Sequence, residues 1–147
     1  MTPDVNVLVA AARSDHPHHG VARAWLEGTF AEAESGLVCT LMPMVLASFL
    51  RLVTSPRIFQ RPTPIEEAIG FIDALLLVPG AQLAELGVEW KRFRQMCLDH
   101  ELTANDVPDA WLAAAVAQRV EHLVSFDRDF RKLLGRAQFT LLASEST

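Results

Sequence analysis

Short apolar segments alternate with longer amphipathic ones along this sequence, which leaves few folds open to it. Three of the short segments have the composition of buried strands, and they span residues 36–40, 122–126 and 138–142. Strands that are apolar on both faces and are separated by helices are typical of a parallel sheet covered on both sides. The alternation therefore predicts a three-layer α/β/α fold with a central parallel sheet.

The segments between these strands carry apolar residues at helical spacing. The predicted helices span residues 20–34, 41–54, 64–78, 87–102 and 109–119, followed by a short helix at 128–134. Thr63 is predicted to cap the third helix, because Pro64 stands at its first position and Glu66 at its third. Residues 5–11 fit either a strand or a helix that follows a short strand at 1–4, and periodicity does not decide between the two.

The overall charge excludes one mode of binding. The length suits a single domain over residues 1–147, and 18 acidic against 13 basic side chains give a net charge of −5. This balance argues against a protein that binds nucleic acid through a general basic surface. Any contact with nucleic acid therefore has to be local.

Nothing in the composition indicates export or insertion into a membrane. Cys39 and Cys97 lie among apolar residues, as buried thiols of a reducing compartment do. The longest apolar stretch, residues 71–79, is shorter than the roughly 20 residues that a membrane-spanning helix needs. No signal peptide is recognisable, so we expect a cytoplasmic protein that does not enter a membrane.

Acidic residues stand where a parallel sheet forms its ligand sites, outside the carboxyl ends of the strands. Asp127 and Asp129 directly follow a predicted strand, and Asp4 ends the first strand if that strand is the short one. Asp106 and Asp109 lie on one face of the first turn of a predicted helix. Carboxylates that converge repel one another, and a hard divalent cation, Mg²⁺ or Mn²⁺, relieves that repulsion. The set favours a metal site that acts on a phosphodiester.

Most of these acids also have a purely structural interpretation. Asp106 suits a helix N-cap, and Asp109 in a first turn is favoured by the helix dipole. Asp127 can cap the helix that follows it, and Asp129 can pair with a surface arginine. Asp4 is harder to explain in this way, because an acid among the apolar neighbours of a core strand needs a partner.

Four segments of the chain stand in a specific order and spacing. They read PDVNVL at residues 3–8, FLRLVTSPRIF at 49–59, VPDAWLAA at 107–114 and SFDRDF at 125–130. Each alone is a loose motif, whereas together they cover nearly the whole chain. In this combination the sequence resembles the PIN domain, and more narrowly the VapC-type ribonuclease toxins of bacterial toxin–antitoxin pairs.

The resemblance implies a Mg²⁺- or Mn²⁺-dependent endoribonuclease. It also implies that Asp4 ends the first strand and that Asn6 begins a helix. The positions that match metal-binding acids of the family are Asp4, Asp109 and Asp127, with Asp129 as an alternative to the last of these. Asn6 and Ser125 match polar positions that support such acids through hydrogen bonds.

One position departs from the family pattern. Ser48 stands where many PIN nucleases carry a glutamate, so this site has fewer carboxylates, although a serine can hold a metal-bound water. Asp106 is the candidate that compensates in part. Arg51 and Arg57 lie close together in the sequence beside Phe59, which suits contact with RNA phosphates and bases. A solvated loop accounts for the same arginines equally well.

The resemblance further implies a VapB-like antitoxin that binds an apolar groove. The helices that carry Trp25 and Phe49 are candidate walls of this groove, and the high apolar fraction favours a homodimer. Two alternatives stay open. One is a catalytically weak or inactive PIN-like or receiver-like module that acts through protein partners, which Ser48 favours. The other is an unrelated metal-dependent phosphohydrolase.

Overall fold

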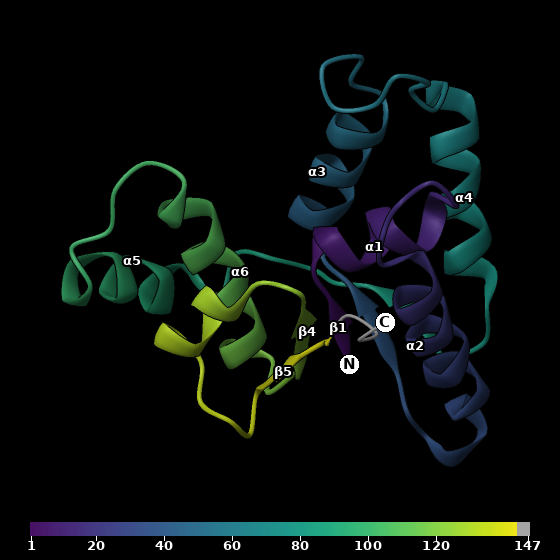
Figure 1. Ribbon diagram of the computed structural model, residues 1–147. Coiled ribbons are helices and arrows are strands. Elements are labelled where there is room, and N and C mark those ends of the chain that lie inside the picture. The colour runs from purple at the N-terminus through teal and green to yellow at the C-terminus, as the bar shows by residue number, and fades with distance from the viewer. Residues whose placement is uncertain (144–147) are drawn as a thin grey trace.

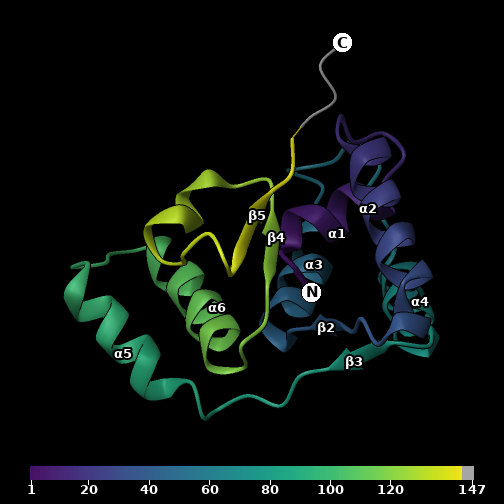
Figure 2. The ribbon, with the colours of Figure 1, turned by 90° about the horizontal axis from the view of Figure 1, so that it is seen from below.

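The computed structural model describes residues 1–143 and contains parallel strands between two groups of helices (Figure 1). Within these residues the strands are β1 (Thr2–Pro3), β2 (Cys39–Leu41), β3 (Ala81–Leu83), β4 (Leu123–Ser125) and β5 (Phe139–Leu141). Helices α5 and α6 lie on one side of the strands and α1 to α4 on the other, as Figure 2 shows from below. The predicted three-layer α/β/α fold is confirmed.

The strands form two short parallel sheets that lie edge to edge. One sheet has the order β1-β4-β5 and the other pairs β2 with β3. The backbone N–H of Thr40 in β2 donates to the carbonyl of Met1 at 2.8 Å, which places β2 beside β1. The spatial order is therefore β3-β2-β1-β4-β5. Strand β3 was absent from the sequence prediction.

The helices fall close to the predicted segments but begin and end elsewhere. Within residues 1–143 the α-helices are α1 (Val5–Ala12), α2 (His19–Ala31), α3 (Pro43–Val53), α4 (Ile65–Leu77), α5 (Trp90–Asp99) and α6 (Asp106–Gln118), and short 3₁₀ helices are η1 (Ala33–Ser35) and η2 (Arg128–Lys132). The ambiguous stretch near the N-terminus is a helix, and the strand before it has only two residues. Helix α3 begins at Pro43 and not at residue 41, because Leu41 pairs with β3.

Three predicted helix starts are wrong for identifiable reasons. Thr63 does not cap α4, since its hydroxyl accepts a hydrogen bond from Arg13 instead and Pro64 takes the cap position. Gly87 does not begin α5, because its φ of +131° is not helical. Asp106 is the first residue of α6 and not its cap, so the helix begins three residues earlier than predicted.

The core fills both faces of the strands. On one face α1 contributes fully buried side chains such as Val7 and Leu8, and α3 contributes Phe49, which stacks on Phe71 of α4 at 5.3 Å between ring centroids. On the other face the alanine-rich α6 buries Leu112, Ala113 and Val116 in the core. No helix within residues 1–143 has the length and apolar character needed to span a membrane.

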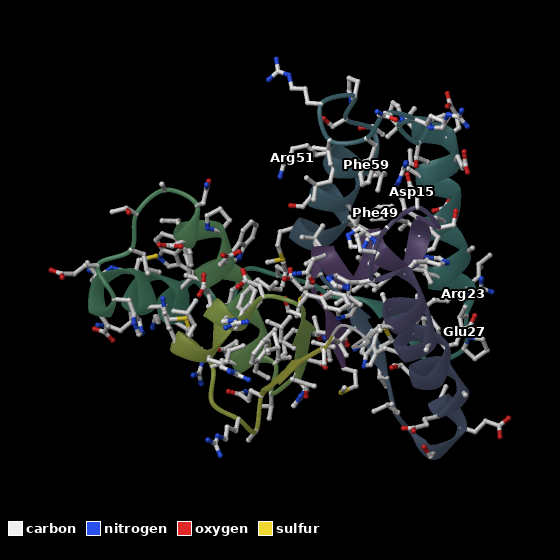
Figure 3. The ribbon with its side chains drawn as sticks, in the orientation of Figure 1. Asp15, Arg23, Glu27, Phe49, Arg51 and Phe59 are labelled. Atoms are coloured by element: carbon white, nitrogen blue, oxygen red, sulfur yellow. The ribbon has the colours of Figure 1, made fainter. Side chains whose placement is uncertain are left out.

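A buried arginine ties the segment after α3 to α1. The guanidinium of Arg13 donates to both carboxylate oxygens of Asp15, at 2.9 and 2.7 Å, and to the carbonyl of Arg61 at 2.9 Å. It also lies 3.8 Å from the centroid of the Phe59 ring. Figure 3 shows Asp15 and Phe59 near each other at this end of the molecule. One face of Phe59 is therefore covered by Arg13, and contact of this residue with RNA stays a prediction.

Candidate active site

Asp4 occupies the carboxyl end of β1, where α1 begins without an intervening loop. Its backbone N–H donates to Val124 of β4 at 2.9 Å, and its Oδ1 accepts the N–H of Val5 at 2.7 Å. The side chain is thus an N-cap through Oδ1, and its second oxygen, Oδ2, accepts the hydroxyl of Ser125. Burial raises the pKa of Asp4, although hydrogen bonds from Ser125 and Val5 act in the opposite direction.

Ser125, the last residue of β4, connects the polar groups of the site. Its hydroxyl donates to Asp4 Oδ2 at 2.7 Å and accepts from Asn6 Nδ2 at 3.0 Å and from the N–H of Asp127 at 2.9 Å. Asn6 in turn accepts the N–H of Phe126 at 3.2 Å. Asn6 and Ser125 therefore hold the ends of β1 and β4 together, while their part in catalysis stays a prediction.

Asp127 follows β4 directly and has two functions in the structure. Its Oδ1 accepts the N–H of Asp129 at 2.9 Å, so it caps the 3₁₀ helix η2, as the structural interpretation of this residue predicts. Its negative charge also raises the pKa of Asp4 and of Asp109. The capping contact orients Asp127 without removing it from the acidic site.

Asp109 lies in the first turn of α6, between the other acids. Burial raises its pKa to about 6, and the negative charges of Asp4, Asp127, Asp106 and Asp129 add to the rise. Four carboxylates from three separate parts of the chain therefore act on one carboxyl group. The structure brings together all five acids that the sequence singles out.

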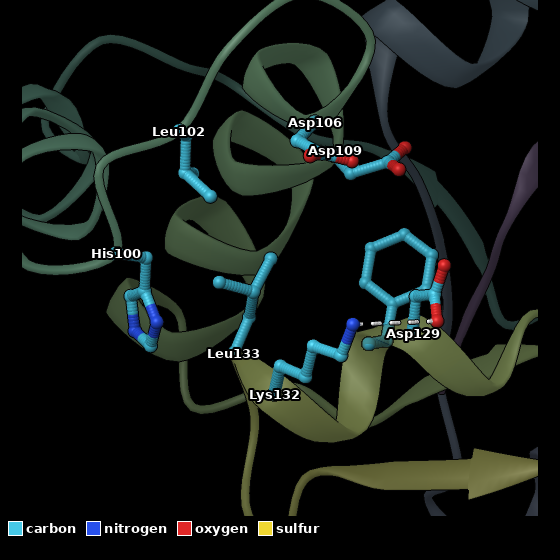
Figure 4. Close-up of a pocket in the computed structure, with 8 residues that line it drawn as sticks. His100, Leu102, Asp106, Asp109, Asp129, Lys132 and Leu133 are labelled. Atoms are coloured by element: carbon cyan, nitrogen blue, oxygen red, sulfur yellow. Dashed lines mark ion pairs between the residues drawn. The ribbon is translucent and has the colours of Figure 1, made fainter.

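Two cavities meet at Asp109. The larger, of about 610 Å³, is lined by Asp4, Asp109 and Ser48 together with apolar side chains of α3, α5 and α6. The smaller, of about 210 Å³, is lined by acids Asp106, Asp109 and Asp129 and by His100 and Lys132 (Figure 4). The Nζ of Lys132 lies 3.9 Å from Asp129, so the partner of Asp129 is a lysine and not the arginine predicted.

The donor set suits a hard divalent cation in its chemistry. All the converging groups are carboxylates or hydroxyls, the ligands that Mg²⁺ and Mn²⁺ prefer, and the raised pKa of Asp109 reflects negative charge that a cation would neutralise. Within residues 1–143, however, no three acidic, histidine or cysteine side chains already lie close enough together to hold one ion. The acids surround Asp109 as neighbours and not as a preformed coordination shell.

The predicted RNA-contacting arginines lie outside these cavities. Arg51 projects from α3 one turn beyond Ser48 (Figure 3), and Arg57 lies in the turn after that helix. Both are exposed, and neither is among the described residues that line the two cavities. Any role in holding RNA would therefore be at a distance from the acids.

Sequence reasoning missed two residues at the site. Trp111 lines the larger cavity and remains 37% exposed. Glu89, not considered before, is buried and accepts a hydrogen bond from the Trp111 indole at 2.7 Å. Trp111 had one usable signal, because it lies two positions after Asp109. Glu89 had none, since its contact depends on how α5 and α6 pack.

The sequence is similar to proteins of a known family. Residues 1–134 match the model of the PIN domain. Ribonuclease VapC31 of Mycobacterium tuberculosis is 37% identical over 130 residues, which cover 88% of this chain and 89% of the relative. Ribonuclease VapC25 of the same organism is 36% identical over 130 residues, with the same shares of both chains.

Two solved structures share the fold. A chain from the crystal structure of VapBC2 from Rickettsia felis, bound to a DNA fragment from their promoter, superposes with a TM-score of 0.64 over 97% of this chain and 98% of its own, at 15% identity. VapC20 of Mycobacterium tuberculosis, described as a sarcin-ricin loop cleaving toxin, gives 0.61 over 89% and 92%, at 19% identity. Together with the sequence matches, these comparisons show that the chain belongs to the PIN domain family, in its VapC group.

Proposed function

We propose that this protein is a divalent-metal-dependent endoribonuclease and the toxin of a toxin–antitoxin pair. The observation that carries the proposal is that Asp4 and Asp109 line one cavity, while the charge of Asp127, directly after β4, raises the pKa of both. The names of the VapC ribonucleases that resemble the chain support RNA as the substrate.

Some residues of the proposed site would bind the cation, and others hold these ligands in position. Asp4 and Asp109 would provide carboxylate ligands of a Mg²⁺ or Mn²⁺ ion. A third carboxylate would come from Asp127 or, as its alternative, Asp129. A bound divalent cation supplies charge neutralisation for the phosphodiester and lowers the pKa of water. Ser125 holds Asp4 in one orientation through its 2.7 Å hydrogen bond and ties it to Asp127. Ser48, which lines the same cavity, offers a hydroxyl in place of a carboxylate.

The proposed partners are an antitoxin and a second copy of the chain. Phe49 itself is only 1% exposed and belongs to the core, so it is not the contact residue of its helix. A groove of about 440 Å³ between α2 and α4 instead offers Leu26, Phe30 and Phe71 to an apolar helix of a VapB-like partner. Exposed apolar side chains on α4 and α5 support a homodimer, and the proposal places the protein with RNA in the cytoplasm.

Cleavage of purified RNA tests the proposal. We expect cleavage with Mn²⁺ or Mg²⁺ that stops on addition of EDTA, and that is lost in Asp4→Asn and in Asp109→Asn. Asp73→Asn, which changes an exposed aspartate on α4, is the matched control and should cleave as wild type. Equal cleavage by all four proteins would overturn the assignment.

The same experiment addresses the main alternative, an inactive module that binds a cation for its effect on partners. Ser48 and the absence, within residues 1–143, of a preformed three-ligand group are the observations that favour it. Binding of Mn²⁺ that depends on Asp109, without cleavage of any RNA offered, would support the module and contradict the nuclease.

A further inference from the structure

One wall of the larger cavity is formed by aromatic and apolar side chains that have no part in the proposed metal site. Trp111 from α6, Phe93 from α5 and Met44 from α3 line the same space as Asp4 and Asp109. Phosphate groups are repelled by carboxylates and gain nothing from apolar side chains. This wall therefore suits an uncharged, flat group that enters the cavity together with the phosphate.

A buried carboxylate holds the tryptophan of this wall in place. Glu89 is only 3% exposed, yet its Oε1 accepts the indole N–H of Trp111 and its Oε2 accepts the N–H of Gly87, both at 2.7 Å. Burial alone would raise the pKa of Glu89, but these hydrogen bonds outweigh it and the pKa is lowered. Glu89 is therefore ionised at neutral pH and fixes the position of the ring.

The contact with Glu89 also restricts what Trp111 can recognise. The indole N–H is the only polar group of the side chain, and it is already bonded inside the protein. The exposed part of Trp111 is the ring surface. It can stack on a partner but cannot form hydrogen bonds with it. Unpaired RNA bases are commonly bound by stacking on aromatic side chains, a contact that tolerates any base.

We propose that Trp111, positioned by Glu89, is the stacking surface for one unpaired nucleobase next to the RNA bond that is cleaved. The inference rests on the proposed function, because it takes RNA as the substrate. The nucleobase is favoured over a protein side chain because the wall is continuous with the acids, so a nucleotide whose phosphate lies at Asp109 brings its base to the wall. Glu89 is a positioning residue and does not contact the substrate.

Cleavage kinetics on a short single-stranded RNA provide the first test. Trp111→Ala should raise KM roughly tenfold or more with a smaller change in kcat, since stacking contributes to binding. Trp111→Phe should retain most of the affinity, and Glu89→Gln, which still offers an oxygen to the indole, should lose less than Glu89→Ala. Trp90→Phe is the matched control, because it keeps an aromatic ring beside Phe93, and Trp90 is 61% exposed on α5 and is not among the described residues that line the cavity.

An RNA series with one abasic nucleotide at successive positions gives the second test. Wild type should bind one RNA of the series more weakly than the intact RNA. In that RNA the abasic nucleotide should stand next to the cleaved bond. Trp111→Ala should bind that RNA and the intact RNA equally. Binding of intact RNA should also quench the fluorescence of wild type and of Trp90→Phe, but not of Trp111→Phe. If the abasic nucleotide at that position weakens RNA binding equally in wild type and in Trp111→Ala, the inference is overturned.

The failure of the inference is distinguishable from failure of the proposed function. If wild type and Trp111→Ala cleave RNA with the same KM, the stacking surface is refuted and the nuclease stands. If wild type cleaves no RNA but shows quenching that depends on Trp111, the stacking surface stands and the nuclease is refuted. If Trp111→Ala weakens only the binding of a protein partner, the wall is a protein contact and the inference is overturned. Thermal melting of each variant shows that it is folded.

Discussion

The hydroxyl of Ser125 donates a 2.7 Å hydrogen bond to Asp4, a residue 121 positions away in the sequence. The same hydroxyl accepts from Asn6 and from the backbone of Asp127. A single small side chain therefore fixes the relative positions of two strand ends and of two of the three acids assigned to the proposed site.

Replacement of Ser125 by alanine should impair activity and stability together. Since the Ser125 hydrogen bond lowers the pKa of Asp4, its loss should raise that pKa further and move the acidic limb of the activity profile to higher pH. The buried polar groups left unpaired should lower the free energy of unfolding by about 1–3 kcal/mol. A pH–rate profile and a urea titration measure the two effects. Ser14→Ala, at an exposed serine, should change neither, and an unshifted pH profile in Ser125→Ala would contradict the proposed coupling.

Asp109 should make the protein less stable as it ionises. Its pKa of about 6 lies above the ordinary value of 3.8, so between these values the folded state binds more protons than the unfolded state. The free energy of unfolding should therefore fall as the pH rises through this window. Asp109→Asn should stabilise the metal-free protein at pH 7 by about 1 kcal/mol, after allowance for solvent screening of a partly exposed group.

Mn²⁺ should make wild type more stable than Asp109→Asn, the reverse of the order without metal. Addition of the ion should raise the melting temperature of wild type more than that of Asp109→Asn, because the ion binds to the ionised carboxylate. Affinity for Mn²⁺ should fall as the pH drops through about 6, where Asp109 of the metal-free protein becomes protonated. A melting temperature of Asp109→Asn below that of metal-free wild type at pH 7 would be evidence against this account.

A carboxylate at position 48 should strengthen cation binding. Ser48 lines the cavity that contains Asp4 and Asp109, so Ser48→Glu places one more negative ligand among them. We expect affinity for Mn²⁺ to rise on the order of tenfold, since ligand charge sets the affinity of such sites. Isothermal titration calorimetry measures the change. Gln60→Glu, at an exposed position that does not line this cavity, separates coordination from a general gain of negative charge, and an equal effect of both variants would contradict coordination by residue 48.

Gly80 should tolerate no side chain. Its φ is +89°, and a Cβ at this position would lie 2.7 Å from the Cβ of Ala33 and 3.3 Å from the carbonyl of Leu37. Gly80→Ala should therefore destabilise the protein by about 1–3 kcal/mol. Gly28→Ala is the counterpart within a helix, where the new Cβ meets no atom of the described residues within 4 Å, and should stabilise by about 0.5–1 kcal/mol. Thermal denaturation that shows the two changes with the same sign would refute this explanation.

Val120 should be better replaced by glycine. It ends α6 with a φ of +53°, and the N–H groups of Val120 and Glu121 donate to Ala117 and Val116, the pattern of a Schellman motif. A β-branched residue is strained in this left-handed conformation, and the Val120 side chain is 85% exposed, so its removal forfeits little packing. Val120→Gly should raise the free energy of unfolding by about 1 kcal/mol. Val120→Ala should gain less, and greater stability of the alanine variant would contradict the argument.

The parts of the fold that depend on local pattern could be predicted from the sequence. The alternation of apolar strands and amphipathic helices sufficed for the layers, and the rule that ligands gather at the carboxyl ends of parallel strands sufficed to single out Asp4 and Asp127. Strand β3 escaped because Ala81–Leu83 lacks β-branched residues and is mostly exposed. It forms because β2 offers it a parallel edge, beginning with the hydrogen bond from Cys39 to the carbonyl of Gly80.

The parts of the site that depend on packing could not be predicted in this way. The contact between Glu89 and Trp111 joins two helices, and it requires the exact approach of α5 to α6. Arg13 is buried and donates to the hydroxyl of Thr63, the residue that was predicted to cap α4. Side-chain hydrogen bonds between distant segments produce no periodic pattern in the sequence, so they could not be predicted from it.

The two-residue length of β1 has a consequence for how such a protein is kept harmless. Asp4 is fastened on one side to a central strand and on the other to the first N–H of a buried helix, so no hinge lies near it. Withdrawing this carboxylate would require unfolding the middle of the molecule. Within residues 1–143 no hinge adjoins this acid, so an inhibitor of the proposed nuclease would have to block the mouth of the cavity.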